Sequence, residues 1–182
     1  MPRKDALANR TRAVAAATEV FRREGLSAGV DRIAREAGIN VSTLYRNFPS
    51  KTELILAVGE SLLEPLKVTC AQVLASDAPD VVHRLLADRV RTYREDRALS
   101  DAFGTVDLDP AIRRELFALA TSAVVPVVER GHADGSLAAD LDATDLLIAL
   151  RMVTSAVASA DNLCRDPLTY VRLVATGLRS HE

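Results

Sequence analysis

Residues 40–51 bring together side chains that can hydrogen-bond to nucleic acid. The hydroxyls of Ser42 and Thr43 can bond to base edges or to phosphates, and a threonine methyl can contact the thymine methyl. Tyr45, Arg46 and Asn47 suit phosphate contacts, which fix the register of a protein on DNA without reading its sequence. The candidate DNA-binding residues are Asn40, Val41, Ser42, Thr43, Tyr45, Arg46, Asn47 and Lys51.

Two short helices are expected to position these side chains. The first spans about residues 30–37 and ends at Gly38, where a positive φ costs little. The second spans about residues 41–48, with Asn40 as its N-cap. This pattern is typical of a helix-turn-helix, whose second helix enters a DNA groove with its N-terminal residues at the base edges. Lys51 adds a positive charge at the start of the following helix, where backbone N–H groups favour a phosphate.

The second helix has a predicted inward face and a predicted outward face. Leu44 and Phe48 are four residues apart and therefore lie on one side of the helix. They are expected to pack on the first and second helices, through Val14, Phe21, Ile33, Ala34, Ala37 and Ile39. The polar residues then face outward. An ordinary solvated face would look the same on a single short helix, so the neighbouring motif residues decide the interpretation.

The rest of the chain also has a helical pattern. No segment alternates as a half-buried strand does, and the seven prolines and eight glycines are few. A first helix is expected over about residues 5–23, ending at Gly25, and a capping box at Ser50–Glu53 opens a long fourth helix that Pro65 kinks or divides. A further helix is expected over about residues 80–97. The next helix starts at Asp109-Pro110 and stops at Gly131, with a kink or break at Pro126. Two more are expected, one after Asp142 and one from Asp166-Pro167 to about residues 177–179.

We therefore predict an all-α protein of about nine helices. A three-helix headpiece occupies residues 1–51, and a larger helical domain occupies residues 52–182. The charge agrees with two roles, because residues 1–51 carry ten Lys/Arg and five Asp/Glu, a net of +5, whereas residues 52–182 carry thirteen and twenty, a net of −7. A basic segment suits a polyanion, and an acidic remainder does not.

Residues 9–55 resemble the DNA-binding domain of the TetR family of bacterial transcriptional regulators. The likeness lies in Ala37-Gly38-Ile39, in Thr43-Leu44-Tyr45-Arg46-Asn47-Phe48-Pro49-Ser50-Lys51, and in Ala16-Ala17, Val20-Phe21 and Gly25 before them. A later segment, Gly131–Leu137, is similar to one often found near the end of such proteins. The resemblance implies a homodimer, most often a repressor and less often an activator, that binds a palindromic operator and is released by a small molecule. It also implies DNA contacts by Ser42, Thr43 and Tyr45, and a phosphate contact by Lys51.

Three residues depart from the family pattern. Val41 stands where Lys or Arg is frequent, Gly29 where a hydroxyl residue commonly starts the second helix, and Asn47 where His is common. These departures remove expected phosphate or base contacts, so no operator sequence can be carried over. Arg3, Lys4, Arg10 and Arg12 could compensate through an N-terminal arm, although a short basic tail is as often only solvated.

Apolar residues of the second domain supply candidates for an effector cavity. Such a site would be a mostly apolar space between helices with a few polar groups. The candidates are Leu62, Leu66, Val90, Tyr93, Phe103, Phe117 and Met152. An ordinary core would use the same residues. The cationic side chains of Arg91, Arg94 and Arg97 could hold an anionic effector or form a solvated outer face.

The last two helices are the candidates for the dimer interface. They carry the apolar residues Leu146, Leu147, Leu150, Val153, Val157, Leu168, Val171 and Val174. Small residues such as Ala149 and Ala156 permit close helix approach, and a two-fold interface would build a four-helix bundle. The core of one subunit would look similar, so this assignment depends on the resemblance.

Other function classes find little support. His83, His132 and His181 have no Cys or carboxylate partner at a catalytic or metal-binding spacing, so we expect no enzyme, no metal and no cofactor. Cys70 and Cys164 suit buried thiols. No membrane span or secretory signal is apparent, which favours the cytoplasm. The alternatives are a helical enzyme with a vestigial headpiece and a helical adaptor that binds protein through the same surface.

Overall fold

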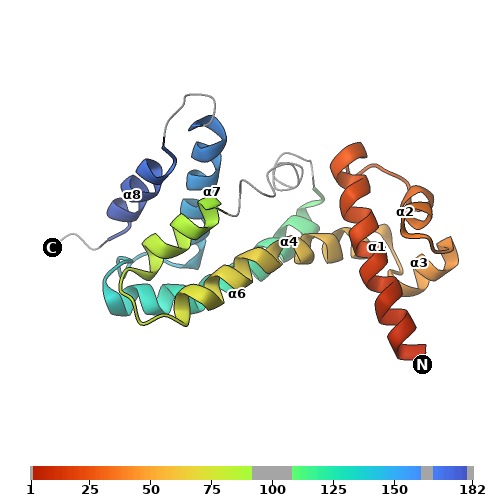
Figure 1. The fold of residues 1–182 in the computed structure, drawn as a ribbon, viewed down its shortest axis with the longest axis horizontal. Helices are drawn as coiled ribbons and strands as arrows, with labels where there is room; N and C mark the ends of the chain where they lie inside the picture. The colour runs from red at the N-terminus through yellow and green to blue at the C-terminus, as the bar shows by residue number, and fades with distance from the viewer. Residues whose placement is uncertain (1, 92–107, 161–165, 180–182) are drawn as a thin grey trace. The chain divides into compact units, whose positions relative to one another are not determined.

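The computed structural model describes residues 2–91, 108–160 and 166–179. Every regular element within these ranges is helical, which confirms the all-α prediction (Figure 1). The described part holds eight helical segments, against about nine expected for the whole chain. They are α1 (Pro2–Glu24), α2 (Val30–Ala37), α3 (Val41–Asn47), α4 (Lys51–Leu74), residues 81–91, α6 (Pro110–Asp134), α7 (Ala143–Ala160) and α8 (Leu168–Gly177).

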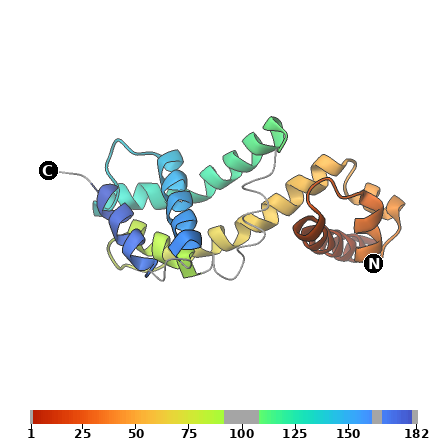
Figure 2. The same cartoon turned by 90° about the horizontal axis from the view of Figure 1, so that it is seen from above.

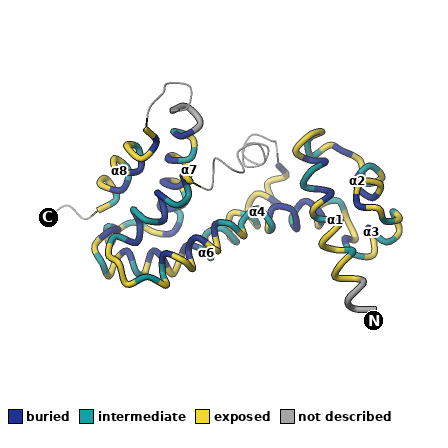
Figure 3. The backbone as a smooth tube through the Cα atoms, in the orientation of Figure 1, coloured by how far each residue is buried: buried dark blue, intermediate teal, exposed yellow. Residues whose placement is uncertain are grey.

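The described residues form two compact units, and residues 2–62 and 108–116 make up the first. In this headpiece, α1 packs against α2 and α3, and each helix has a buried side and an exposed side (Figure 3). Leu44 and Phe48 are almost fully buried together with Phe21 and Ile33, so the predicted inward face of α3 is confirmed. A period of 3.6 residues places positions four apart on one side, which explains why this face could be predicted.

The headpiece core extends beyond α3. The first two turns of α4 contribute Leu54, Ile55 and Val58, and the start of α6 contributes Leu108 and Ile112. The two helices approach closely at one glycine, because a Cβ added to Gly59 would lie 2.5 Å from a methyl of Leu116. Residues 52–62 therefore belong to the same compact unit as the three helices before the predicted boundary at residue 51.

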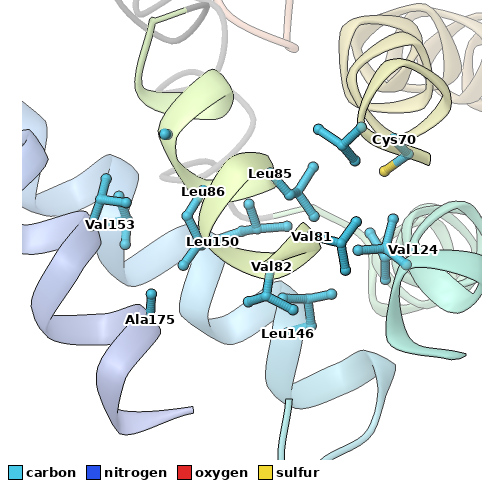
Figure 4. Packing of buried hydrophobic residues seen from close by; sticks show 14 of the residues in the cluster. Cys70, Val81, Val82, Leu85, Leu86, Val124, Leu146, Leu150, Val153 and Ala175 are labelled. Atoms are coloured by element: carbon cyan, nitrogen blue, oxygen red, sulfur yellow. The ribbon is translucent and has the colours of Figure 1, made fainter. Parts of the chain in front are cut away.

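The second unit contains the remaining described residues, 63–91, 117–160 and 166–179. Figure 2 shows α7 and α8 from above, and Figure 4 shows how aliphatic side chains of α4, α6, α7, α8 and residues 81–91 meet. This core is almost entirely aliphatic; in the described residues, Thr69 and Ser136 are its buried polar members. Cys70 is a free, buried thiol, and its burial raises its pKa to about 11, so it stays protonated at neutral pH. The buried role predicted for Cys70 is confirmed, and Cys164 lies outside the described residues.

Several predicted helix starts are confirmed by hydrogen bonds. Ser50 Oγ accepts the Glu53 N–H at 3.2 Å, Asp109 Oδ1 accepts the Ala111 N–H at 2.7 Å, and Asp166 Oδ1 accepts the Leu168 N–H at 3.0 Å. Asp142 Oδ1 accepts the Thr144 N–H at 2.7 Å, while Asp145 Oδ2 accepts the Asp142 N–H at 2.9 Å. Each bond satisfies a donor that the first turn of a helix leaves without an intrahelical partner.

Two helix boundaries differ from the prediction. The first helix begins at Pro2 rather than near residue 5. Of the kink or break left open at Pro65 and Pro126, the break does not occur, because each proline lies inside one helix. The predicted stop at Gly131 is wrong, because α6 runs on to Asp134 and the turn comes at Gly135, with φ +73°. Gly131 has a packing role instead: a Cβ there would lie 3.0 Å from Leu137 Cβ and from a methyl of Val82.

The end of α6 caps the helical segment 81–91 from a distance. Asp134 Oδ2 accepts the Val81 N–H at 3.1 Å, and Ser136 Oγ accepts the Val82 N–H at 3.4 Å. Asp134 Oδ1 also accepts the Ser136 N–H at 2.9 Å, which orders the turn that carries both caps. This gives the Gly131–Leu137 segment, singled out in the sequence, a structural role. Among the helices of the described ranges, none is long and apolar enough to cross a membrane.

Candidate nucleic-acid interface

A three-residue turn joins α2 to α3. Gly38 adopts the left-handed conformation, with φ +63°, and its N–H donates to the Ala34 and Arg35 carbonyls. The Ile39 N–H donates to the Ala34 carbonyl at 3.0 Å. The turn therefore satisfies the last carbonyls of α2 while it redirects the chain by using a φ that favours glycine.

Asn40 occupies the N-cap of α3 through its backbone. Its carbonyl accepts the Thr43 and Leu44 N–H groups at 2.9 and 3.0 Å. Its side chain makes no capping hydrogen bond and is exposed. The predicted position of the cap is confirmed, and the Asn40 amide stays available to a ligand outside the protein.

The outward side of α3 presents a small polar surface. Ser42 and Arg46 are exposed, and the Tyr45 side chain is 44% exposed although it is large and partly apolar. Thr43 is half-buried. An exposed aromatic next to hydroxyls and a cation suits contacts with phosphates and base edges. We call the surface formed by Ser42, Thr43, Tyr45 and Arg46 the reading face.

Three of the predicted DNA-binding residues lie outside the reading face and are half-buried. Val41 is half-buried and packs against the headpiece core, because the start of α3 faces inward at this position. Asn47 turns its amide back on its own helix, and its Nδ2 donates to the Thr43 carbonyl at 2.8 Å. One of the two N–H donors of this amide is therefore already engaged within the protein. Lys51, in the first turn of α4, is half-buried.

Ion pairs occupy much of the positive charge on α1 and α2. Arg23 and Arg32 both contact Glu36, at 3.1 and 3.0 Å, and Arg32 also reaches Glu24 at 3.2 Å. Arg22 hydrogen-bonds to Glu19, and that bond is the main reason why the pKa of Glu19 lies below its usual value. By contrast, Arg46 and Lys51 have no acidic partner within 4 Å in the part of the chain that the structure describes. Uncompensated charge therefore lies at the end of α3, and also at Arg10, Arg12 and Arg35, whose hydrogen bonds within the described residues go to uncharged groups.

Arg10 has a role that the sequence did not predict. Its guanidinium lies over the Phe48 ring, 4.5 Å from the ring centre, and its Nη1 donates to the Asn47 carbonyl at 3.1 Å. The sequence left open whether Arg10 compensates as part of an N-terminal arm or is only solvated; the structure places it on α1, opposite the end of α3. No local pattern could have indicated this contact, because it joins positions 37 residues apart.

The candidate effector residues fall into different environments. Leu66 and Val90 are buried in the core of the second unit, whereas Leu62 is half-buried in the first unit. Phe117 and Met152 are exposed in the single chain, and Tyr93 and Phe103 lie outside the described residues. The structure therefore brings Leu66 and Val90 into one cluster and leaves Phe117 and Met152 at its surface.

Most of the candidate interface residues serve the core of one subunit. Those that face inward are Leu146, Leu150, Val153, Val157 and Val171, while Leu147 and Val174 pack partly buried against the same core. Leu168 is exposed. The same two helices expose other large apolar side chains, Ile148 (51% exposed), Met152 and Leu173 (64% exposed). The helical period correctly separates two faces of each helix, but it does not say which face the subunit itself covers.

Side chains that could hold a metal ion do not gather in the described ranges. No three of their His, Cys, Asp and Glu side chains come together as a metal site would require. His132 Nε2 lies 3.0 Å from the Leu141 carbonyl, as in a structural turn, and His181 is outside the described residues.

Known proteins resemble this chain in two ways. The family described as "Bacterial regulatory proteins, tetR family" matches residues 13–58, which include α2, α3 and the start of α4. An HTH-type transcriptional regulator of Staphylococcus aureus is 44% identical over 57 residues, which is 31% of each protein, so the match spans about a third of that relative.

Solved structures extend the likeness to the whole fold. A TetR transcription regulatory protein from Mycobacterium vanbaalenii is 27% identical, with a TM-score of 0.58 over 99% of this chain and 100% of the other. The transcriptional regulator FadR from Bacillus subtilis, solved in complex with stearoyl-CoA, is 15% identical, with a TM-score of 0.73 over 93% and 97% of the two chains. The second likeness shows the fold alone. Residues 13–58 therefore match the DNA-binding domain of the tetR family of bacterial regulatory proteins, and the described fold is similar to that of solved TetR regulators.

Proposed function

We propose that this protein regulates transcription by binding an operator in double-stranded DNA through α3, and that a small molecule releases it. The reading face carries the proposal. Leu44 and Phe48 anchor one side of α3 in the headpiece core, so Ser42, Tyr45 and Arg46 are held outward on a rigid helix. A short helix that presents hydroxyls, a phenol and a cation in this manner fits the major groove.

The electrostatics support a polyanionic partner. Arg46 and Lys51 flank the end of α3 without acidic partners in the described residues, whereas Arg22, Arg23 and Arg32 are paired with glutamates. Phosphate contacts release counterions from DNA, so binding should weaken steeply as salt rises. This dependence separates a DNA reader from the alternative of a protein-binding adaptor.

We propose a homodimer on a palindromic operator. One headpiece reads a half-site, and two half-sites one duplex turn apart, about 34–36 Å, require two reading helices related by a two-fold axis. The exposed apolar residues of α7 and α8 support an interface there, because Ile148 and Met152 lie four residues apart on one side of α7. The buried leucines and valines of the same two helices would hold this exposed apolar side in place.

We propose that the effector is a largely apolar molecule bound by the second unit. The core of that unit is almost wholly aliphatic in the described residues, which suits a ligand with a hydrocarbon or aromatic body. FadR of Bacillus subtilis, similar in fold, was solved with stearoyl-CoA. The effector would act by its differential affinity for the DNA-binding and the free conformations, and by no more than that difference.

Selection of bound duplexes from a random library tests the function directly. We expect a palindrome of two half-sites and an affinity that falls with salt by a slope of about −0.9 for each phosphate contacted. Repeating the selection in the presence of long-chain acyl and aromatic compounds would identify a class that abolishes recovery. Recovery of no common sequence, with salt-independent binding to a protein partner, would favour the adaptor instead.

A further inference from the structure

We infer that Arg10 is a positioning residue for the reading face: it ties α1 to the end of α3 and sets how that face meets DNA. The inference rests on the proposed DNA-binding function and adds a residue outside the helix-turn-helix to it. The observation is the double contact of one guanidinium, which lies over the Phe48 ring at 4.5 Å and donates to the Asn47 carbonyl at 3.1 Å.

The contact meets the electrostatic need of a helix C-terminus. The last carbonyls of α3 have no intrahelical donors and carry partial negative charge. The helix has only seven residues, and its next residue, Phe48, has an extended backbone with φ −139° and ψ 92°. No glycine closes the end of α3 in the way that Gly38 closes α2. A cation from α1 takes that place.

The contact also has a fixed geometry. Phe48 is buried, so its ring offers a stationary platform, and a cation over an aromatic face is attracted to the ring electrons. The guanidinium is planar and can stack on the ring while one N–H points at the carbonyl. Arg10 therefore constrains both the position and the direction of the last turn of α3, where Asn47 also closes back on Thr43.

This role differs from that of a phosphate ligand. A phosphate-binding arginine adds affinity for every sequence alike and contributes about one unit to the salt slope. A positioning residue acts through Tyr45 and its neighbours on α3, so its loss should reduce the preference for the correct sequence and leave the salt slope unchanged. Arg46, which is exposed on the reading face, is the natural comparison.

The experiment compares Arg10→Ala, Arg10→Lys and Arg46→Gln in the full-length protein. The probes are the duplex recovered by selection and a scrambled duplex of equal length, titrated over a range of salt. For Arg10→Ala we expect the preference for the selected duplex to fall about three- to tenfold, with the salt slope unchanged. Arg10→Lys should recover part of the preference, and Arg46→Gln should lower the slope with little change in preference.

A second measurement does not need DNA. Hydrogen exchange followed by NMR should show the Phe48 amide, which donates to the Leu44 carbonyl at 2.9 Å, exchanging several-fold faster in Arg10→Ala. Arg12→Ala is the matched control, because Arg12 bonds to Asn9 on its own helix. Faster exchange without any sequence-specific binding by the parent would refute the DNA-binding function while it supports the tie between α1 and α3. Unchanged exchange, or a lower salt slope with intact preference, would overturn the positioning role.

Discussion

At the scale of single residues, α3 uses adjacent positions for opposite purposes. The Leu44 side chain is 1% exposed within the headpiece core, whereas that of Tyr45, its neighbour, is 44% exposed on the reading face. Successive residues of a helix point about 100° apart, so one substitution can address the core and the next can address the partner. This pair therefore separates folding from binding.

Replacing Tyr45 by Ala should weaken binding to the selected duplex about three- to tenfold, as expected for one lost hydrogen bond and its contact area, with an unchanged melting temperature. Replacing Leu44 by Ala should cost about 2–5 kcal/mol in the free energy of unfolding, because it leaves a cavity in the core. Thermal melts and binding titrations of both variants check this. A stable Leu44→Ala protein would contradict the inward face, and unaltered binding by Tyr45→Ala would contradict the outward one.

Two glycines that border α2 differ in what they require. Gly38 has φ +63°, whereas Gly29, the N-cap, has φ −74°, which any residue can adopt. Neither glycine has an atom within 4 Å of an added Cβ, so conformation alone distinguishes them. Gly38→Ala should destabilise the protein by about 1–2 kcal/mol, the cost of a left-handed conformation for an L-residue.

At the same helix, Gly29→Ser should stabilise the protein by a few tenths of a kcal/mol, because serine supplies the capping oxygen that glycine lacks. Denaturant unfolding of the two variants beside the parent measures both effects. An equal loss of unfolding free energy in both variants would show that neither position tolerates a side chain and that the difference in φ does not decide their stability. The substitution would also return a hydroxyl to the position where the family commonly has one, so its effect on DNA affinity is informative in its own right.

At the scale of elements, the junction between α6 and residues 81–91 holds the second unit together. Partial burial disfavours the charge on Asp134, but the hydrogen bonds that its carboxylate accepts from Ser136, Val81 and Asp80 outweigh this and lower its pKa. Arg179, just after α8, also pairs with Asp80. Three segments distant in sequence therefore meet at one turn through charge and hydrogen bonding.

Asp134→Asn should make the protein less stable at neutral pH, by about 1 kcal/mol if it behaves as the loss of a helix cap. Since the pKa is lower in the folded state, the carboxylate contributes stability above the unfolded value near 3.8, and that contribution disappears as the pH falls through the folded value. The free energies of unfolding of the two proteins in urea should therefore converge as the pH falls from about 5 to below the folded pKa of Asp134, which itself lies below 3.8. Asp140→Asn, at an exposed residue of the next turn, is the control. A difference that stays constant with pH would refute the electrostatic account.

At the scale of the whole molecule, two helices take part in both cores. Leu54 and Val58 of α4 lie in the headpiece core, and Leu66 and Val73 of the same helix lie in the second core. The same holds for α6, which contributes Ile112 to the first core and residues such as Val124 to the second. In the proposed regulator, these continuous helices are the elements through which an effector could bias the headpiece.

The proposed dimer depends on the exposed apolar side of α7. Ile148→Glu should dissociate the dimer, because a charge buried in an apolar interface without a partner is costly. Light scattering at micromolar concentration should show the mass fall to half, while the helical content stays unchanged because Ile148 is 51% exposed in the single chain. Val68→Glu, on the exposed side of α4, is the control and should remain a dimer. A parent protein that is already monomeric would refute the proposed dimer, whereas an Ile148→Glu protein that remains a dimer would place the interface elsewhere.

The sequence by itself determined what depends on neighbours along the chain. Caps at Ser50, Asp109 and Asp142, the turn at Gly38, and the pairing of Leu44 with Phe48 are all local, so residue types and a 3.6-residue period were enough to predict them. The helix-turn-helix and its outward polar face follow from those same signals. The sequence alone therefore predicts the fold class and most of the reading face.

Only the tertiary structure decided what depends on residues far apart. Arg10 meets Asn47 across 37 positions, and Asp134 caps Val81 across 53. Gly131 lies inside α6, and Leu137 and Val82 approach it so closely that an added Cβ would lie 3.0 Å from each. Likewise α7 has two apolar faces, and packing alone determined that Leu146 is buried and Ile148 exposed. Periodicity gives each helix its faces, but only its neighbours in space decide which face is covered.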